Sequence, residues 1–326
     1  MYIEDLQFSL WADFIERDYL DREFKELIEK KIINGATSNP AIFKNAILNS
    51  PAYKVQLESL EGVLAKEKYE AVAIYDIQKA ADILKPLHDM GDDGYVSIEV
   101  DPFLCDDAQA TIEEGKRLFQ TIGRENVMIK VPATEAGYIA MKELTAVGIP
   151  VNATLIFKTS QAISCAKAFR EGAAIYGKSV DTVISIFVSR VDRALDPLLE
   201  KHNIPTALSG IYNASLIYEA IQNMKVVGCR ALFASTGVKD NALPPHYYIE
   251  KLLAYNSVNT APVETIKAFC ANGSYKQALP IDERSINDHF MQIEALGITM
   301  DELLQKQIDD GLKAFKEAFQ EILEAL

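Results

Sequence analysis

Short apolar stretches alternate with longer amphipathic ones along this chain, and the alternation predicts its elements. Several of the apolar stretches have the length and composition that are typical of β-strands. They cover 8–14, 35–40, 95–102, 127–134, 151–157, 182–189 and 229–236, and an eighth strand is expected somewhere in 248–258. Helices are predicted at about 21–32, 51–89, 106–121, 134–147, 160–174, 209–223 and 300–326.

Strands that alternate with helices predict a parallel sheet, and eight such units predict a closed barrel. We therefore expect an α/β fold, a (β/α)8 TIM barrel with additional helices, as a single domain over residues 1–326. The alternative is an open, doubly wound sheet. That fold prefers a glycine-rich turn after its first strand, and this sequence has none there.

The last predicted helix, over about 300–326, has an apolar stripe on one side. The stripe consists of Leu304, Ile308, Leu312, Phe315 and Phe319. It suits a helix that packs on the barrel, and it also suits an oligomer contact. Both a monomer and a homodimer remain open.

The predicted strand 127–134 contains a lysine among apolar residues. Val127, Ile129 and Val131 lie on one face of this strand, while Met128 and Lys130 lie on the other. Because apolar residues occupy both faces, the strand should be buried on both sides. Burial lowers the pKa of a lysine and makes its neutral amine a nucleophile that can form a Schiff base. The alternative is a lysine whose stem packs while its charged head reaches solvent.

Other predicted strands also carry polar groups near their C-terminal ends. These residues are Asp13, Asn39, Glu99, Asn152, Thr154, Ser185 and Ser235. Each has a simple explanation on its own, such as a helix cap, a turn or a solvated strand end. In a barrel, however, the C-terminal ends of all strands meet at one mouth, where such enzymes place their chemistry. The pattern therefore indicates an active site around Lys130.

These residue types suit the condensation of a lysine with a ketone. Glu99 could transfer protons through a water that Thr154 holds. Asp13 could take the proton of a substrate hydroxyl and trigger cleavage of a carbon–carbon bond. Asn39 and Asn152 could orient the hydroxyls of the bound fragment. This chemistry requires no metal.

Composition and charge narrow the possible partners. The formal net charge is −14, which argues against nucleic acids and anionic membranes. No apolar run is long enough to span a membrane, and the first residues lack the basic start and apolar core of a signal peptide. The four scattered cysteines, without a CxxC pair, suit the reducing cytoplasm. An anionic substrate would need cations at its own site.

Two patterns that would indicate other chemistry are weak. Segment 172–179 matches GxxxxGK[ST], but a predicted helix precedes it and a predicted strand follows, the reverse of a nucleotide-binding loop. We interpret it as a helix end and a loop. The histidines at 88, 202, 246 and 289 show no ligand spacing, so neither a metal nor another cofactor is expected.

Three motifs together resemble the bacterial transaldolases, a family of Schiff-base aldolases. They are the lysine segment 129–134 (IKVPAT), the segment 37–43 (TSNPAIF) and the segment 152–157 (NATLIF). The resemblance extends from Trp11 to about residue 262. It implies a barrel enzyme of the pentose phosphate pathway, which moves a dihydroxyacetone unit from sedoheptulose 7-phosphate or fructose 6-phosphate to glyceraldehyde 3-phosphate or erythrose 4-phosphate.

The resemblance also implies roles for individual residues. Lys130 would form the Schiff base, with Asp13 and Glu99 as acid and base. Asn39, Asn152, Thr154 and Ser185 would bind the dihydroxyacetone part or its water. Phe187 marks transaldolases against the related fructose-6-phosphate aldolases, which carry tyrosine there. Such an aldolase, or a catalytically silent barrel that binds sugar phosphates, remains the alternative.

The expected phosphate site departs from the family pattern at one position. The resemblance implies that Arg190 and Ser235 hold the substrate phosphate. In the family's common form an arginine stands two residues after this serine, but Gly237 stands there in this chain. Lys239 is expected to supply the second cation, and Arg193 or Arg230 comes next if it does not.

Overall fold

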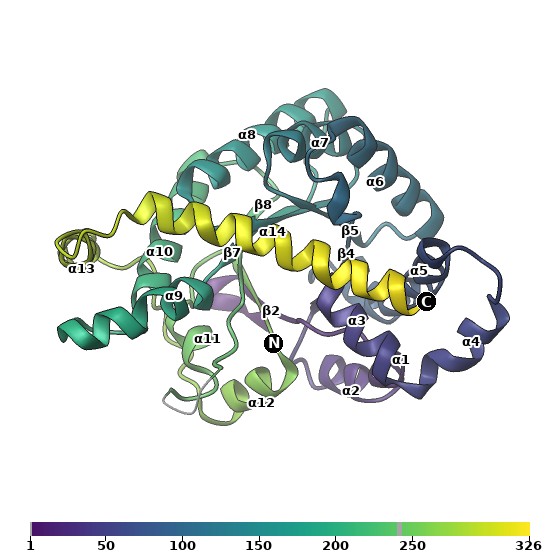
Figure 1. Ribbon diagram of the computed structural model, residues 1–326, viewed down its shortest axis with the longest axis horizontal. Coiled ribbons are helices and arrows are strands. Elements are labelled where there is room, and N and C mark those ends of the chain that lie inside the picture. Colours follow the sequence, from purple (N-terminus) through teal and green to yellow (C-terminus); the bar gives the residue numbers. More distant parts are fainter. Residues whose placement is uncertain (1, 240–242) are drawn as a thin grey trace.

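The computed structural model describes residues 2–239 and 243–326, and eight parallel strands form a closed barrel at its centre (Figure 1). The strands are β2 (Phe8–Ala12), β3 (Gly35–Thr37), β4 (Tyr95–Glu99), β5 (Val127–Pro132), β6 (Val151–Ile156), β7 (Thr182–Phe187), β8 (Cys229–Ala234) and β9 (Ser257–Ala261). They pair in chain order, and β2 pairs with β9 to close the ring. A short strand β1 (Tyr2–Ile3) lies antiparallel to β2. The predicted (β/α)8 barrel is therefore confirmed.

Helices surround the barrel on its outer side (Figure 1). They are α1 (Arg17–Asp21), α2 (Glu23–Glu29), α3 (Pro40–Asn49), α4 (Lys54–Ser59), α5 (Ala65–Asp89), α6 (Ala108–Ile122), α7 (Glu135–Thr145), α8 (Thr159–Tyr176), α9 (Ser189–Leu199), α10 (Ser209–Met224), α11 (Tyr247–Lys251), α12 (Val263–Asn272), α13 (Glu283–Glu294) and α14 (Met300–Ala325). Single 3-10 turns lie at Glu4–Leu6, Pro51–Tyr53, Pro102–Leu104 and Glu200–His202. None of the described helices is long and apolar enough to cross a membrane.

Two helix predictions need correction. The helix expected over 51–89 is broken into a 3-10 turn, α4 and α5, because the segment between α4 and α5 contains Gly62 in the left-handed region, with φ +82°. Further helices were not predicted, namely α1, α3, α9, α11, α12 and α13. The GxxxxGK[ST] segment covers the last turn of α8, its C-cap Gly177 with φ +80°, and the start of the following loop, as the simple interpretation expected.

The prediction of the eighth strand was largely wrong. The apolar run near 248 forms helix α11 and the buried turn after it, whereas the strand is β9 at Ser257–Ala261. Its sequence, Ser-Val-Asn-Thr-Ala, has little of the hydrophobic signal of a buried strand. It is nevertheless fully buried, because β2 and β8 pair with it on both sides. Closure of the barrel, rather than local hydrophobicity, therefore fixes this strand.

A large aromatic residue, Trp11, fills the interior of the barrel toward its N-terminal end. The Trp11 indole is fully buried among inward-facing side chains of other strands, namely Met128, Val183, Leu232 and Val258. Its Nε1–H donates to Asp93 Oδ2 at 2.9 Å. Gly35 leaves the room for this ring, since a Cβ at that position would lie 2.6 Å from indole atoms.

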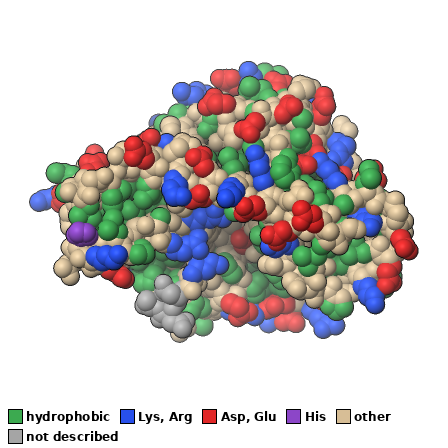
Figure 2. Space-filling view, viewed as in Figure 1, with side chains coloured by type: hydrophobic (Ala, Val, Ile, Leu, Met, Phe, Trp, Pro, Cys, Tyr) green, Lys and Arg blue, Asp and Glu red, His purple; other side chains and the backbone are tan. Residues whose placement is uncertain are grey.

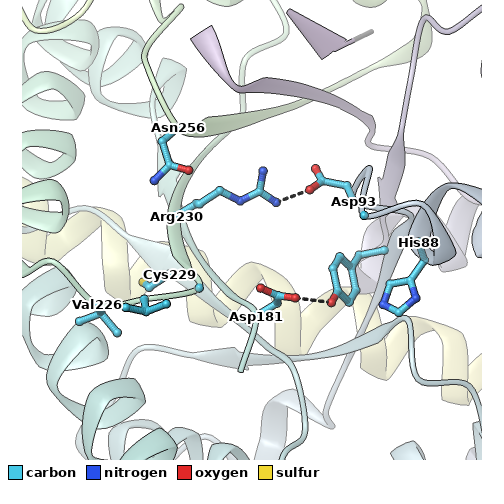
Figure 3. A pocket seen from close by; sticks show the side chains of 11 residues that line it. His88, Asp93, Asp181, Val226, Cys229, Arg230 and Asn256 are labelled. Atoms are coloured by element: carbon cyan, nitrogen blue, oxygen red, sulfur yellow. Dashed lines mark hydrogen bonds and ion pairs between the residues drawn. The ribbon is translucent and has the colours of Figure 1, made fainter. Parts of the chain in front are cut away.

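Charged side chains at the N-terminal end of the barrel pair with one another. Arg230 and Asp93 point toward one another across a cavity of about 380 Å³ (Figure 3), and the Arg230 Nη2–Asp93 Oδ1 distance is 2.6 Å. Beside them, the Tyr95 hydroxyl donates to Asp181 Oδ2 at 2.7 Å. In barrels of this type the N-terminal face serves stability, and the pairing here is consistent with that role.

Helix α14 crosses the opposite, C-terminal mouth of the barrel (Figure 1). The predicted apolar stripe faces inward, with Leu304, Ile308, Phe315 and Phe319 buried. Ion pairs hold the helix near both ends, Lys158–Asp301 at 2.8 Å and Lys44–Glu321 at 2.7 Å. The helix therefore packs on the barrel and covers its mouth.

The packing of Trp11 against Gly35 predicts a large effect from one methyl group. Gly35→Ala should lower the free energy of unfolding by about 1–3 kcal/mol, because the added Cβ overlaps the indole in a closed barrel that cannot expand. Urea denaturation measures this change. In a Trp11→Leu background the same substitution should cost much less, and an equal cost in both backgrounds would contradict the steric explanation.

Candidate active site

A cavity of about 270 Å³ opens at the C-terminal ends of the strands, below α14. Its wall contains most of the residues that the sequence singled out, namely Asp13, Asn39, Lys130, Thr154, Ser185, Phe187, Arg190, Ser235 and Lys239. Glu99 and Asn152 are buried and lie outside the set of lining residues. The barrel mouth therefore brings together side chains from strands that are far apart in the sequence.

The Lys130 amino group is buried inside the barrel. The residue is only 5% exposed, so the alternative of a head that reaches solvent does not hold. Nζ donates to the Ser38 carbonyl oxygen at 3.1 Å and lies 3.4 Å from Glu99 Oε2. The Phe315 ring of α14 covers it, with 5.6 Å between Nζ and the ring centroid. A single, largely buried amine thus lies next to one carboxylate at the bottom of the barrel mouth.

Glu99 is the immediate partner of this amine because its strand lies in register with that of the lysine. Glu99 pairs with Lys130 across β4 and β5. Burial raises the pKa of Glu99 from 4.5 to about 7; Lys130 opposes the rise, and the Asp13 carboxylate adds to it. Neither carboxylate oxygen accepts a hydrogen bond from the described residues. A carboxyl with such a pKa can both give and take a proton near neutral pH.

Asp13 provides a second carboxylate just beyond the end of β2. Thr37 Oγ1 donates to its Oδ1 at 2.7 Å. Burial raises the pKa of Asp13, while Lys130, the Thr37 hydrogen bond and Lys239 act in the opposite direction. Two carboxyl groups of different surroundings therefore flank one amine, an arrangement that can divide the acid and base steps of a reaction between them.

The two predicted groups on β6 have different surroundings. Asn152 lies beneath the cavity, where its amide donates to Ser97 Oγ at 3.0 Å and its carbonyl accepts from Ser185 Oγ at 2.6 Å. Thr154 lies in the cavity wall, and its Oγ1 has no hydrogen-bond partner among the described residues. A bulge follows it, where Leu155 takes φ +60° and the register with β7 shifts. The bulge lets Leu155 pack with the inner cluster of the barrel, next to Thr154.

Asn39 links the cavity to the start of a helix. Its Oδ1 caps α3 by accepting from the Ile42 N–H at 3.0 Å, and the residue also lines the cavity. The simple explanation, a residue at a turn, is therefore correct for its carbonyl. Its amide group has no hydrogen-bond partner among the described residues.

Positively charged side chains gather on one side of this cavity. Arg190 and Arg193 come from the first turns of α9, and Lys239 follows β8. Figure 2 shows lysine and arginine side chains grouped beside a hollow on the face that α14 crosses. Within 2–239 and 243–326 none of the three forms an ion pair. Burial and the neighbouring Arg193 lower the pKa of Arg190, and Asp310 opposes this.

The cations have neutral neighbours that suit an anion. The Arg190 guanidinium carbon lies 5.1 Å from the centroid of the Phe187 ring. Ser235 takes φ +55°, and its hydroxyl lies 3.0 Å from Ser189 Oγ. Unpaired guanidinium groups that share a cavity repel one another, and a bound anion such as a phosphate would relieve this repulsion.

Sequence reasoning missed several lining residues and misplaced one alternative. Arg193 was named only as a further candidate for the phosphate, and it does line the cavity, one helical turn after Arg190 on α9, a helix that was not predicted. Ala314 and Phe315 had none, because nothing local indicates that α14 returns to the mouth. Arg230, named as a further phosphate candidate, lies at the opposite end of the barrel and pairs with Asp93 (Figure 3).

The histidines lie outside the cavity wall. In the part of the chain that the structure describes, His88, Asp89 and Glu125 form the one group whose ligand atoms could meet at a metal ion. Lys85 already forms ion pairs with both of these carboxylates. This group is on the outer side of the barrel and is separate from the cavity around Lys130.

Known proteins resemble this chain along nearly its whole length. Residues 10–326 match the family described as Transaldolase/Fructose-6-phosphate aldolase. A Campylobacter jejuni subsp. doylei protein named Transaldolase is 47% identical, over 98% of this chain and 99% of the relative. A Helicobacter pylori protein of the same name is 44% identical, over 97% of this chain and 98% of the relative.

The raised pKa of Glu99 predicts a pH-dependent loss of stability. The pKa is about 7 in the folded protein against 4.5 ordinarily, so the stabilising effect of its proton is complete below about pH 4.5 and lost as the pH rises through 7. Glu99→Gln does not titrate. As the pH rises from 4.5 to about 8, the wild type should therefore lose up to about 3 kcal/mol of unfolding free energy relative to Glu99→Gln. Above about pH 8 the difference between the two proteins should stay constant.

Urea denaturation of both proteins at several pH values measures this difference. Glu113→Gln, on the exposed side of α6, serves as the control and should follow the wild type at every pH. Parallel stability curves for Glu99→Gln and the wild type between pH 5 and 8 would contradict the assignment.

Proposed function

The chain belongs to the transaldolase/fructose-6-phosphate aldolase family of enzymes, and we propose that it transfers a dihydroxyacetone unit between sugar phosphates through a Schiff base on Lys130. The observation that carries the proposal is the buried Lys130 amine, 3.4 Å from Glu99 and open to the cavity. A buried amine beside a carboxyl that titrates near neutral pH has the properties of an imine-forming nucleophile. The proposed donors are sedoheptulose 7-phosphate and fructose 6-phosphate.

The geometry supports a division of labour between the two carboxyl groups. Lys130 Nζ attacks the substrate ketone, and Glu99 moves the protons that allow water to leave, through a water held at the free Thr154 hydroxyl. Asp13 takes the proton of a substrate hydroxyl, and the carbon–carbon bond breaks. The electron pair of that bond flows into the iminium and gives a neutral enamine. An acceptor aldehyde then reacts with the enamine, and hydrolysis frees Lys130.

Phe187 favours transfer over simple cleavage. Its ring lines the cavity and packs on Phe157, with 5.4 Å between ring centroids. A phenylalanine brings no hydroxyl to the site, so it cannot direct a water toward the enamine. The enamine should therefore await an aldehyde acceptor. A fructose-6-phosphate aldolase, the alternative within the family, would release free dihydroxyacetone without one.

The cations of the cavity suit the phosphate of the substrate. In a protein with a net charge of −14, a sugar phosphate is repelled at long range unless the mouth is locally basic. Arg190, Arg193 and Lys239 provide that charge at the cavity, and Ser235 adds a hydroxyl. The substrate carbonyl would then lie near Lys130 while its phosphate lies at the start of α9.

We also infer the compartment from the cysteines. Cys105, Cys165, Cys229 and Cys270 are all free thiols, and the first three are buried. This suits the reducing cytoplasm. A role in the pentose phosphate pathway follows from the proposed substrates, and either a monomer or a homodimer is compatible with it.

Borohydride trapping tests the central proposal. Reduction in the presence of fructose 6-phosphate should fix a dihydroxyacetone or sugar adduct on Lys130, which peptide mass mapping locates. Lys130→Met should give no adduct, and Lys142→Met, on the outer helix α7, should react as the wild type does. An adduct on another lysine, or none in the wild type, would refute the Schiff-base proposal and favour a silent binding barrel.

The phosphate site predicts a substrate-selective effect. Arg190→Ala should lower kcat/KM for fructose 6-phosphate roughly ten- to a hundredfold, because one charge-assisted hydrogen bond is lost, and should leave that for unphosphorylated fructose nearly unchanged. Lys239→Ala should act in the same direction more weakly, since its side chain is exposed. The control is Arg284→Ala on the exposed side of α13. A wild-type ratio of the two substrates in both variants would place the phosphate elsewhere.

A further inference from the structure

A buried carboxylate lies on the same helix turn as the two arginines of the cavity. Asp192 is only 1% exposed, and its side chain makes two short hydrogen bonds to other helices. Its Oδ1 accepts from the Gly210 N–H of α10 at 2.7 Å, and its Oδ2 accepts from the Tyr248 hydroxyl of α11 at 2.8 Å. One side chain therefore connects α9, α10 and α11.

Asp192 and the arginines occupy different sides of α9. With about 100° per residue, Arg190 and Arg193 lie about 60° apart around the helix axis, whereas Asp192 lies about 160° from Arg190. The structure agrees, since both arginines line the cavity and Asp192 is buried against the neighbouring helices. The helix thus has a cationic face toward the substrate and an anchored face behind it.

Helix α9 lacks the usual means of fixing its start. Val188 occupies the N-cap position, and no side chain there accepts a hydrogen bond from the first turn. The start of the helix nevertheless packs closely on α10: a Cβ on Gly210 would lie 2.5 Å from the Val188 carbonyl oxygen and 3.0 Å from Asp192 Oδ2. Asp192 therefore ties down a turn that has no side-chain cap.

Among the described residues, Asp192 has no cation that compensates its charge. No lysine or arginine within 2–239 and 243–326 pairs with it. Burial raises the pKa of Asp192 to about 7, and the nearby Asp196 adds to the rise. The hydrogen bonds from Gly210 and Tyr248 act in the opposite direction and lower it. A buried, unpaired carboxyl contributes little to stability by itself. Its two directed hydrogen bonds point to a role in positioning.

We propose that Asp192 is a positioning residue that holds the first turn of α9 against α10 and α11, so that Arg190 and Arg193 face the cavity together as one anion site. The proposal rests on the proposed phosphate site but not on the Schiff base. It assigns Arg193 to the anion site as the cation that compensates for Gly237. It also predicts that substrate affinity depends on a residue that touches no substrate.

Binding of inorganic phosphate, measured by calorimetry on the full chain, tests the proposal without any turnover. Asp192→Ala should weaken phosphate binding about tenfold, and Arg193→Ala by a similar factor, because each disturbs a charge-assisted contact. Asp192→Asn should remain within about threefold of the wild type, since its amide can still accept from Gly210 and bond to Tyr248. Kinetics should show a higher KM for fructose 6-phosphate in the variants that bind phosphate more weakly, with kcat little changed.

Asp76 offers a matched control for stability. It is also a buried carboxylate that accepts a hydrogen bond from a tyrosine hydroxyl, that of Tyr53 at 2.7 Å, although unlike Asp192 it also pairs with Arg17 at 3.0 Å. It lies on α5, outside the cavity wall. Asp76→Ala should lower the free energy of unfolding and leave phosphate binding unchanged. Equal weakening of phosphate binding by Asp76→Ala and Asp192→Ala would show a general structural effect and overturn the proposal.

Tyr248→Phe keeps the proposal testable if Asp192→Ala does not fold. It removes one of the two anchoring bonds and should weaken phosphate binding about two- to fivefold. Unchanged phosphate binding in this variant would overturn the proposal, as would a wild type that binds no phosphate. If the wild type binds phosphate with the predicted variant pattern but forms no imine on Lys130, the catalytic proposal fails and the role of Asp192 stands.

Discussion

The ion pair of Lys130 and Glu99 inside the barrel is the interaction on which the rest of the site depends. Burying two charges is costly, and their 3.4 Å contact offsets only part of that cost. The remainder appears as the raised pKa of Glu99. Register of β4 with β5 fixes the pair, and the Phe315 ring of α14 lies 5.6 Å from the amine at the cavity wall. The closed barrel thus maintains a pair that an open strand end would let water separate.

The two ends of the barrel treat charge in opposite ways. At the N-terminal end, Arg230 pairs with Asp93, so the charges compensate one another within the protein (Figure 3). At the C-terminal end, Arg190 and Arg193 share a cavity without a carboxylate partner among the described residues. The cavity at the N-terminal end, about 380 Å³, is of similar size to the one at the C-terminal end, about 270 Å³, but among the described residues the C-terminal one has the cations without a carboxylate partner. Unsatisfied charge, rather than cavity size, therefore distinguishes the binding end.

The sequence predicted what depends on local pattern and missed what depends on closure. Alternation placed Lys130 and Glu99 on inner faces of buried strands, and the shared direction of parallel strands brought their ends to one mouth. The position of strand β9 was not predicted, because its polar sequence is buried only through pairing with strands on both sides. The place of Phe315 in the cavity wall was not predicted for a similar reason, since α14 reaches the mouth from the far end of the chain. The strained φ of Leu155 has no sequence signal either, because it lies in a bulge defined by the neighbouring strand.

Gly237 shows how the proposed anion site can depart from the family pattern and keep its charge. A Cβ at this position would lie 3.1 Å from Pro262 Cγ and 3.9 Å from Thr265 Oγ1, so a side chain there would start against α12. Local space therefore disfavours an arginine at 237. A cation on α9 avoids that contact, because the helix presents Arg193 beside Arg190 in the wall of the same cavity. An anion site on α9 requires that the first turn of this helix be fixed in place. Asp192 is the buried group that fixes it, through its hydrogen bonds to α10 and α11.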